Sequence, residues 1–562
     1  MEAQGTKRRS VWRSKIAWCL VVGTLGLSLI AVLCSPFMTV QATPRQQDQK
    51  KVKAPSLEGG KAWLNTKKPI TLKQLRGRIV ILDFWTLCCI NCIHSLPTLA
   101  KLEEKYGELL VVLGIHSPKF PNEKKTESIR KAILRYGIKH PVVNDADMKI
   151  WKRYFVRAWP TLYLIDPEGN VVGYTSGEAD FKTLDNRISE LVKIYGKKKM
   201  LKKEPLPFQL ERKNEDPGAT PLYFPGKILP DAKAKRLFIA DSTHHRVVIT
   251  DLEGKQVASA GSGKEGFQDG SFATAQFSDP QGMTRVGNIL YVADRNNHTI
   301  RALDLIKKTV KTVAGTGKQA RAYRDRYVPG GAREIPMNSP WDLLYHKGKI
   351  YVAMAGHHQI WTFDPTQKIL APYAGDGREN ILDGALDESQ FAQPSGLARD
   401  GKFLYVADSE TSSIRKLTLA KKFNQNGMPK LTDNLKVTTI VGTGLFDNGD
   451  KDGTGDEVLL QHALGVAFRN GKLYLADTYN SKLKLLDPIT RVCKTITLTR
   501  PKGEKGPILN EPGGLGFIGN QLYIADTNSH RIRVVDINTK EIRTLPLQGV
   551  EPPAVYRKAS KE

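Results

Sequence analysis

Two hydrophobic patterns follow one another along this chain of 562 residues. Between residues 55 and 196, short apolar runs typical of buried strands alternate with longer amphipathic segments typical of helices. The expected strands include residues 79–85, 109–115 and 162–165, and the expected helices 89–106, 127–136 and 181–195. This alternation predicts an α/β domain.

Beyond Tyr223 the helical period disappears, and a phrase ending in Ala-Asp or Ala-Met recurs six times. The copies are Leu237–Asp241, Leu290–Asp294, Ile350–Met354, Leu404–Asp408, Leu473–Asp477 and Leu522–Asp526. Their last residues lie 53, 60, 54, 69 and 49 positions apart, enough for one four-stranded blade per copy. Residues 220–548 are therefore expected to form an all-β propeller.

A candidate redox site lies where the strand 79–85 leads into the helix that follows it. Cys89 and Cys92 stand at the start of that helix, whose partial positive charge favours a thiolate at Cys89 and places Cys92 one turn away. Two alternatives are a metal site that adds His94 or His116, and a fold remnant with inert cysteines. No second C-x-x-C motif occurs, which disfavours a metal site, so no metal is expected.

The remaining cysteines do not change this picture. Cys88 is expected to be a packed residue at the end of the strand, Cys493 is isolated, and Cys19 and Cys34 lie near the N-terminus. Six cysteines in a chain of this length do not make a disulfide scaffold.

The frame around the two cysteines resembles the thioredoxin superfamily at several positions. Asp83 matches the family's buried carboxylate, Trp85 its active-site tryptophan, and Pro97 its helix-kinking proline. Residues 158–161, Ala-Trp-Pro-Thr, resemble the cis-proline loop, and Cys-Ile-Asn-Cys is similar to the exported, DipZ-type branch.

The resemblance implies roles for these positions. It implies a redox-active disulfide between Cys89 and Cys92, with Asp83 assisting deprotonation of Cys92. It implies no cofactor, a cis peptide bond at Pro160, and contacts to substrate from a further set of residues, namely Trp85, Trp159, Pro160 and Thr161.

The six repeats resemble NHL repeats, which build six-bladed propellers, and the whole order resembles NHL-repeat-containing thioredoxin-like proteins. The recurring aspartates are expected to cap the turns that follow them. The histidines recur at nearly one position of the blade, which indicates a rim that binds peptides or proteins and not a metal centre; these are His244, His245, His298, His357, His358 and His530.

The N-terminus predicts export. Basic residues precede an uncharged, mostly apolar run at 16–36, followed by Val40-Gln41-Ala42, so residues 1–42 resemble a signal peptide or an uncleaved membrane anchor. Both alternatives place the redox domain outside the cytoplasm. The expected divisions are then 43–54 (linker), 55–196 (thioredoxin-like domain), 197–219 (basic linker), 220–548 (propeller) and 549–562 (basic tail).

The net charge of +28 makes the surface basic, with a cluster between Gly196 and Lys213 that is expected to be a solvated linker. An anionic membrane surface is the next candidate partner, and nucleic acid is disfavoured because no aromatic-basic motif accompanies the charge. The sequence thus predicts an exported or tethered thiol-disulfide oxidoreductase whose partners are protein thiols or disulfides and an unidentified electron donor or acceptor. The alternative is a non-catalytic scaffold that binds proteins through both domains.

Overall fold

The computed structural model describes residues 52–213, 215–321, 323–432 and 434–557. The predicted export segment 1–42, most of the linker 43–54 and the last five residues of the chain lie outside the described residues. Within the described residues, no helix is both long and apolar enough to cross a membrane.

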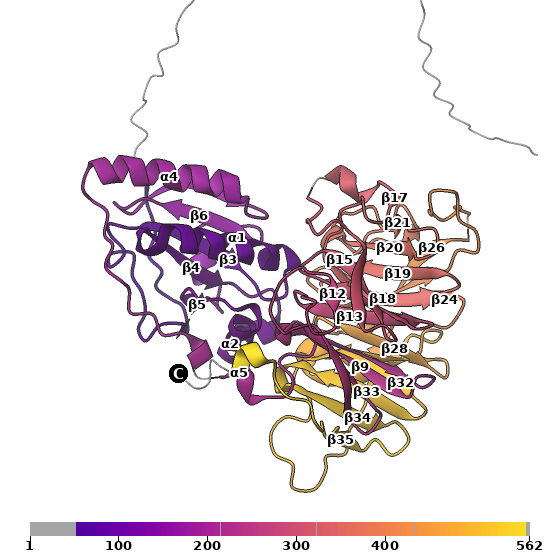
Figure 1. Cartoon of the computed structure of the whole chain (residues 1–562). Helices are drawn as coiled ribbons and strands as arrows, with labels where there is room; N and C mark the ends of the chain where they lie inside the picture. Colours follow the sequence, from indigo (N-terminus) through magenta and orange to yellow (C-terminus); the bar gives the residue numbers. More distant parts are fainter. Residues whose placement is uncertain (1–51, 214, 322, 433, 558–562) are drawn as a thin grey trace, which may run out of the picture. The chain divides into compact units, whose positions relative to one another are not determined.

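The first domain is built on a seven-stranded mixed sheet with the order β1-β7-β6-β3-β4-β5-β2 (Figure 1). Its central strand, β3 (Ile79–Trp85), runs parallel to β4 (Leu110–His116) and antiparallel to β6 (Thr161–Ile165). The remaining elements are β1 (Val52–Lys53), β2 (Trp63–Leu64), β5 (Val142–Asn144), β7 (Asn170–Ser176), α1 (Ile90–Tyr106), α2 (Thr126–Tyr136), α3 (Lys149–Arg153) and α4 (Phe181–Lys197). The predicted α/β domain is confirmed, and the expected strands and helices agree with the observed ones to within a few residues.

Strand β3 is buried on both faces because alternate side chains enter two cores. Phe84 packs with Trp151 and Tyr154 on one face. Ile81 packs with Leu99 of α1 in the other core, which also includes residues of α4. A strand fixed on both sides gives the loop after Trp85, which leads to the two cysteines, a rigid starting point.

The second domain is a six-bladed propeller, as predicted, in which each copy of the repeated phrase forms the second strand of a blade. The inner strands are β8 (Lys227–Asp231), β13 (Pro280–Val286), β18 (Pro340–His346), β23 (Pro394–Arg399), β28 (Gly465–Arg469) and β32 (Pro512–Ile518). The second strands are β9 (Arg236–Asp241), β14 (Ile289–Asp294), β19 (Lys349–Met354), β24 (Phe403–Asp408), β29 (Lys472–Asp477) and β33 (Gln521–Asp526).

Two further strands complete each antiparallel blade. The third strands are β10 (Arg246–Thr250), β15 (Thr299–Asp304), β20 (Gln359–Asp364), β25 (Ser413–Thr418), β30 (Lys482–Leu486) and β34 (Arg531–Asp536). The fourth are β11 (Gln256–Ala260), β16 (Thr309–Ala314), β21 (Ile369–Ala374), β26 (Lys436–Val441), β31 (Val492–Thr495) and β35 (Ile542–Thr544). Two-residue strands widen blades two to five at the outer edge: β12 (Gly270–Ser271), β17 (Gly330–Gly331), β22 (Gly384–Ala385) and β27 (Gly453–Thr454).

Each blade is joined to the next through one residue that stands just before the inner strand. We call these six residues the ring positions: Phe224, Asp279, Ser339, Gln393, His462 and Glu511. All six have positive φ, between 48° and 65°. The backbone N–H of each donates to a side chain of the preceding blade, namely to His530, His245, His298, His358, Ser412 and Ser481 in that order.

These contacts correct the prediction for four of the histidines. His245, His298, His358 and His530 accept a backbone hydrogen bond from the neighbouring blade at 3.0–3.2 Å, so they connect blades instead of forming a free binding rim. Burial lowers the pKa of His298 and of His358, the latter to about 4, which keeps both rings neutral and able to accept.

The recurring aspartates serve the same junctions. Asp294 accepts from Ser278 N–H at 2.8 Å, holding the residue just before a ring position, and from Asn297 in the following turn at 2.8 Å, as predicted for a cap. Where the phrase ends in methionine, Met354 Sδ accepts from Asn338 N–H at 3.4 Å in the same place. The repeat therefore conserves the position of an acceptor even where the aspartate is lost.

The segment between the two domains was expected to be a solvated linker, and in its second half it is not. Phe208 forms a bridge with Thr66 and packs with Leu206 against the core of the first domain. Glu211 also binds Arg130 of α2 at 2.8 Å. Apolar side chains within the basic segment thus attach it to the first domain. Likewise Tyr556, in the short helix α5 (Ala554–Arg557), donates to Thr243 O at 3.1 Å.

Candidate active site

The turn between β3 and α1 presents the cysteine pair. Cys89 is the N-cap of α1, and its Sγ accepts a hydrogen bond from Cys92 N–H at 3.3 Å. Both are free thiols, with 7% of Cys89 and 1% of Cys92 exposed. The structure therefore confirms the predicted position of the cysteine pair at the start of a helix.

Asp83 lies within β3, in the middle of the sheet. Its side chain is fully buried, and neither carboxylate oxygen has a hydrogen-bond partner among the described residues. Burial raises the pKa of Asp83 to about 7. Burial is also the main cause of the raised pKa of Cys92, to which the Asp83 charge adds. An unpaired carboxylate that titrates near neutrality is suited to exchange a proton with a neighbouring thiol.

The four residues expected at the substrate lie in different environments. The Trp159–Pro160 peptide bond is cis, as predicted. Trp159 is half-buried against Trp151 and donates from Nε1 to Ser117 O at 2.9 Å. Thr161 is buried and donates to Ala158 O at 2.8 Å, which fixes the loop. Trp85 is wholly buried and meets His116 edge to face, so it supports the site from within.

Glu123, which sequence reasoning did not single out, organises the loop before Cys89. Its buried carboxylate accepts from Thr86 Oγ1 at 2.6 Å and from Cys88 N–H at 3.0 Å. It also accepts from the N–H groups of Lys119 and Phe120 at 2.7 and 3.0 Å. One carboxylate thus ties the cysteine turn to the loop after β4. The neighbours of Glu123 in the sequence, Pro-Asn before it and Lys-Lys after it, are typical of an exposed polar turn and carried no signal of this role.

The propeller face that carries the ring positions packs on the cysteine turn. Gln393 Oε1 accepts from Ile90 N–H at 2.9 Å, and Gln393 Nε2 donates to Cys88 O at 2.9 Å. Ser339 contacts His94, with 2.6 Å between Oγ and Nε2, and Glu511 accepts from Asn122 Nδ2 at 2.7 Å. Three ring positions of the second domain therefore make polar contacts with the first domain beside its redox pair, and a fourth, His462, packs on the ring of Phe120.

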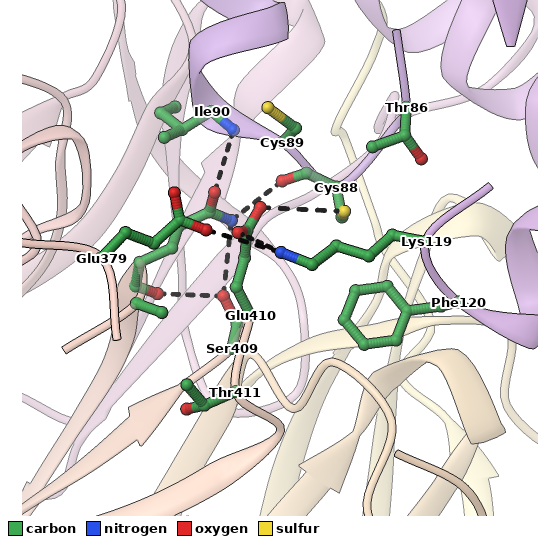
Figure 2. Close-up of polar contacts among 12 residues, drawn as sticks. Thr86, Cys88, Cys89, Ile90, Lys119, Phe120, Glu379, Ser409, Glu410 and Thr411 are labelled. Carbon is green, nitrogen blue, oxygen red and sulfur yellow. Dashed lines mark hydrogen bonds and ion pairs between the residues drawn. The ribbon is translucent and has the colours of Figure 1, made fainter. Parts of the chain in front are cut away.

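A buried ion cluster lies at the same contact. Lys119 Nζ lies 2.8 Å from Glu410 and 3.5 Å from Glu379, both in the propeller. Figure 2 shows the Cys88 sulfur facing Glu410, at 3.8 Å, while the Cys89 side chain points away from it. Burial raises the pKa of Glu410 to about 7. Burial lowers the pKa of Lys119, but the charges of Glu410 and Glu379 oppose this, and the net shift is upward. Cys88 is a buried residue, as expected, and burial with the charges of Glu123 and Glu410 keeps its pKa well above normal.

The helix was expected to lower the pKa of Cys89, but in this arrangement the pKa is raised. Burial raises the pKa of Cys89; the hydrogen bonds from Cys92 lower it, and the charges of Glu410 and Glu379 raise it. Helix and hydrogen bonds favour a thiolate, but removal of water by the packed propeller opposes one more strongly.

The two histidines of the metal alternative are engaged elsewhere. His94 Nδ1 lies 2.6 Å from Glu178, and His116 Nε2 accepts from Leu87 N–H at 3.3 Å. Burial lowers the pKa of His116 to about 3. Among the residues that the structure describes, no three His, Cys, Asp or Glu side chains are arranged to hold a metal ion.

Fold and site together define a class: this is an NHL-repeat-containing, thioredoxin-like protein, with a C-x-x-C helix in its first domain and a six-bladed propeller as its second. A thioredoxin-like family model matches residues 77–171. Over most of its length the chain is similar to two curated relatives. It is 43% identical over 471 residues to Protein SUPPRESSOR OF QUENCHING 1, chloroplastic, of Arabidopsis thaliana, covering 80% of this chain.

The second relative is NHL repeat-containing protein 2 of Gallus gallus, 38% identical over 498 residues, covering 82% of this chain. The chain spans 43% of the plant protein's length and 66% of the chicken protein's. Its first domain is also 32% identical over 124 residues to Thiol-disulfide oxidoreductase ResA of Bacillus thuringiensis, covering 22% of this chain and 69% of that protein. The first domain is thus related to thiol-disulfide oxidoreductases.

Proposed function

We propose that this chain is a thiol-disulfide oxidoreductase that uses Cys89 and Cys92. The Cys89 thiolate attacks a disulfide of a client, forms a mixed disulfide and releases one client thiol. Cys92 gives its proton to Asp83 and attacks the Cys89 sulfur, which closes the Cys89–Cys92 disulfide and releases the second client thiol. Two electrons pass from the pair to the client, and a separate thiol donor restores the pair. The reverse sequence oxidises a client.

One observation carries the proposal: Cys89 is the N-cap of α1 and its sulfur accepts from Cys92 N–H at 3.3 Å, while the unpaired, buried carboxylate of Asp83 is near enough for its charge to raise the pKa of Cys92. This set supplies a nucleophile, a resolving thiol and a proton acceptor from β3 and the start of α1, the helix that follows it. Trp159, Pro160 and Thr161 are proposed to hold the client backbone beside the cysteines, and Trp85 to support them from inside.

Reduction of insulin disulfides by the full chain, with dithiothreitol as donor, tests the proposal. The wild-type chain is expected to accelerate reduction and the Cys89→Ser variant to fall to the uncatalysed rate. Cys493→Ser, which removes a buried cysteine of the propeller, is the matched control and should retain activity. Equal rates for wild type and Cys89→Ser would exclude the proposal.

The place of action is a further part of the proposal. The charge and hydropathy of residues 1–42 support export or tethering outside the cytoplasm, where thiol pairs of this kind handle disulfides of folded proteins. A fusion of residues 1–54 to a reporter that is active only after export is expected to be active. Arg8 and Arg9 belong to the basic flank, and its neutralisation should reduce export.

One observation favours the alternative, a non-catalytic scaffold. The propeller leaves only 7% of Cys89 exposed, which is little for attack on a protein disulfide. A Cys92→Ser variant distinguishes the two, because an oxidoreductase is expected to accumulate mixed disulfides with clients when resolution is blocked. A scaffold would yield none and would bind the same proteins without either cysteine.

A further inference from the structure

Gln393 belongs to the propeller, yet it makes the closest polar contacts to the peptide groups on both sides of Cys89. Its Oε1 accepts from Ile90 N–H and its Nε2 donates to Cys88 O, each at 2.9 Å. The primary amide thus bridges the two peptide units that flank the nucleophile. The sequence separation is 303 residues for one bond and 305 for the other.

Gln393 is itself held firmly. Its side chain is fully buried, and its backbone N–H donates to His358 Nδ1 at 3.1 Å across the blade junction. Its carbonyl accepts from Ser395 Oγ at 2.8 Å and from Ser409 Oγ at 2.9 Å. A residue fixed by three hydrogen bonds within the propeller is placed to impose geometry on its partner rather than to adapt to it.

The bond to Ile90 N–H has a chemical consequence. Ile90 is the first residue of α1, and the first N–H groups of a helix have no partner within it. These groups are the donors that a helix offers to an anion at its N-terminus. The Cys89 sulfur, as the N-cap side chain, accepts from Cys92 N–H at 3.3 Å, while Gln393 compensates the partial positive charge of the Ile90 N–H in the adjacent peptide group.

We propose that Gln393 is a positioning residue of the redox site: its amide holds the two peptide groups around Cys89 and compensates the partial positive charge of the Ile90 N–H beside the Cys89 sulfur. The proposal rests on the proposed function and deepens it, because it makes the propeller part of the redox centre. Gln393 touches no reacting atom; it acts through the backbone of Ile90 and Cys88.

The test uses two substitutions at one position, with opposite expected effects. Gln393→Leu removes the acceptor and leaves the partial positive charge of the Ile90 N–H uncompensated beside the thiolate, so the pKa of Cys89 should fall. A fall of one unit would give roughly tenfold faster alkylation below that pKa. Gln393→Glu places a negative charge beside the same N–H, so the pKa should rise and alkylation at neutral pH should slow.

The measurement is the pH profile of iodoacetamide labelling of Cys89 in the full chain, resolved by peptide mass spectrometry. Gln359→Leu is the matched control: Gln359 is equally buried and makes two bonds, to Gly375 O at 2.7 Å and from Trp361 Nε1 at 3.0 Å, both within the propeller. This control should lose stability without moving the Cys89 profile.

Shifts of the same sign for Gln393→Leu and Gln393→Glu would show simple loosening of the contact and overturn the proposal, as would an equal shift from Gln359→Leu. If Gln393→Glu does not fold, Gln393→Asn replaces it. Asn is too short to bridge both peptide groups, and its profile should move as that of the Leu variant does; an unchanged profile would overturn the proposal.

Labelling does not require turnover, so the two proposals can fail separately. A wild-type chain that reduces no disulfide, with the opposite shifts present, would end the oxidoreductase proposal and leave the positioning role. An active chain without those shifts would end the positioning proposal and leave the oxidoreductase proposal. In an active chain, Gln393→Leu should also change kcat more than KM, since Gln393 touches no client.

Discussion

At the scale of the residue, Asp83 combines a structural cost with a chemical use. The pKa of Asp83 is about 7 in the native state and 3.8 in the unfolded chain. Between these two pH values the native carboxyl group keeps its proton, whereas the unfolded chain has released it. Stability is therefore full below pH 3.8 and declines as the pH rises to about 7. The difference corresponds to roughly 4 kcal/mol.

Asp83→Asn is expected to remove this decline. Relative to wild type, the variant should gain up to about 4 kcal/mol in free energy of unfolding at pH 8 and little at pH 4, as measured by urea unfolding. It should also slow resolution of the mixed disulfide roughly 100-fold, the usual range for loss of a general base. A stability gain that is the same at both pH values would contradict the assigned pKa.

At the scale of the element, the inner strands of the propeller are joined by one buried lysine. Lys227 of β8 donates to Ser395 O at 2.7 Å and to Leu464 O at 2.6 Å, and lies 3.5 Å from Asp342. These partners belong to three other blades. A cavity of about 250 Å³ lies beside this contact between the inner strands. The lysine therefore links four blades at the wall of this cavity.

Lys227→Met should leave the buried Asp342 without its cation and reduce the free energy of unfolding by roughly 3–5 kcal/mol. The double variant Lys227→Met, Asp342→Asn should recover most of this loss, because it removes the unpaired charge. Lys472→Met, which breaks an exposed pair with Asp487, is the control and should cost less than about 1 kcal/mol. A similar loss in the single and double variants would show that packing, and not charge, is responsible.

The elements themselves could be predicted from sequence because their signals are local. The run at β3, the C-x-x-C motif at a helix start and the six repeated phrases are each contained within about one element. Gln393 and Glu410 could not be found in this way, since their partners in the first domain lie 291 or more residues away. The histidines were misinterpreted for the same reason: a repeated turn was visible, but its bond to the next blade was not.

At the scale of the whole molecule, the contact between the two domains decides how accessible the thiols are. Lys119 is the cation of that contact, with Glu379 and Glu410 as its partners; the side chains of Lys119 and Glu410 are buried, and that of Glu379 is about one-third exposed, at 35%. Lys119→Met would leave two neighbouring carboxylates unpaired, a loss of roughly 3–5 kcal/mol that opening of the contact relieves by hydration. Cys88 and Cys89 should then be labelled faster by a bulky maleimide.

The triple variant Lys119→Met, Glu379→Gln, Glu410→Gln should return labelling toward the wild-type rate, because it keeps the packing without unpaired charge. Lys105→Met, which breaks an exposed pair with Asp185, should leave labelling unchanged. Fast labelling in the triple variant as well would mean that the ion pairs themselves, and not relief from unpaired charge, hold the domains together. Unchanged labelling in Lys119→Met would show that the hydrogen bonds of the ring positions close the site without the ion cluster. The difference in labelling rate between the single and triple variants thus measures how far the protection of Cys89 by the propeller depends on one buried lysine.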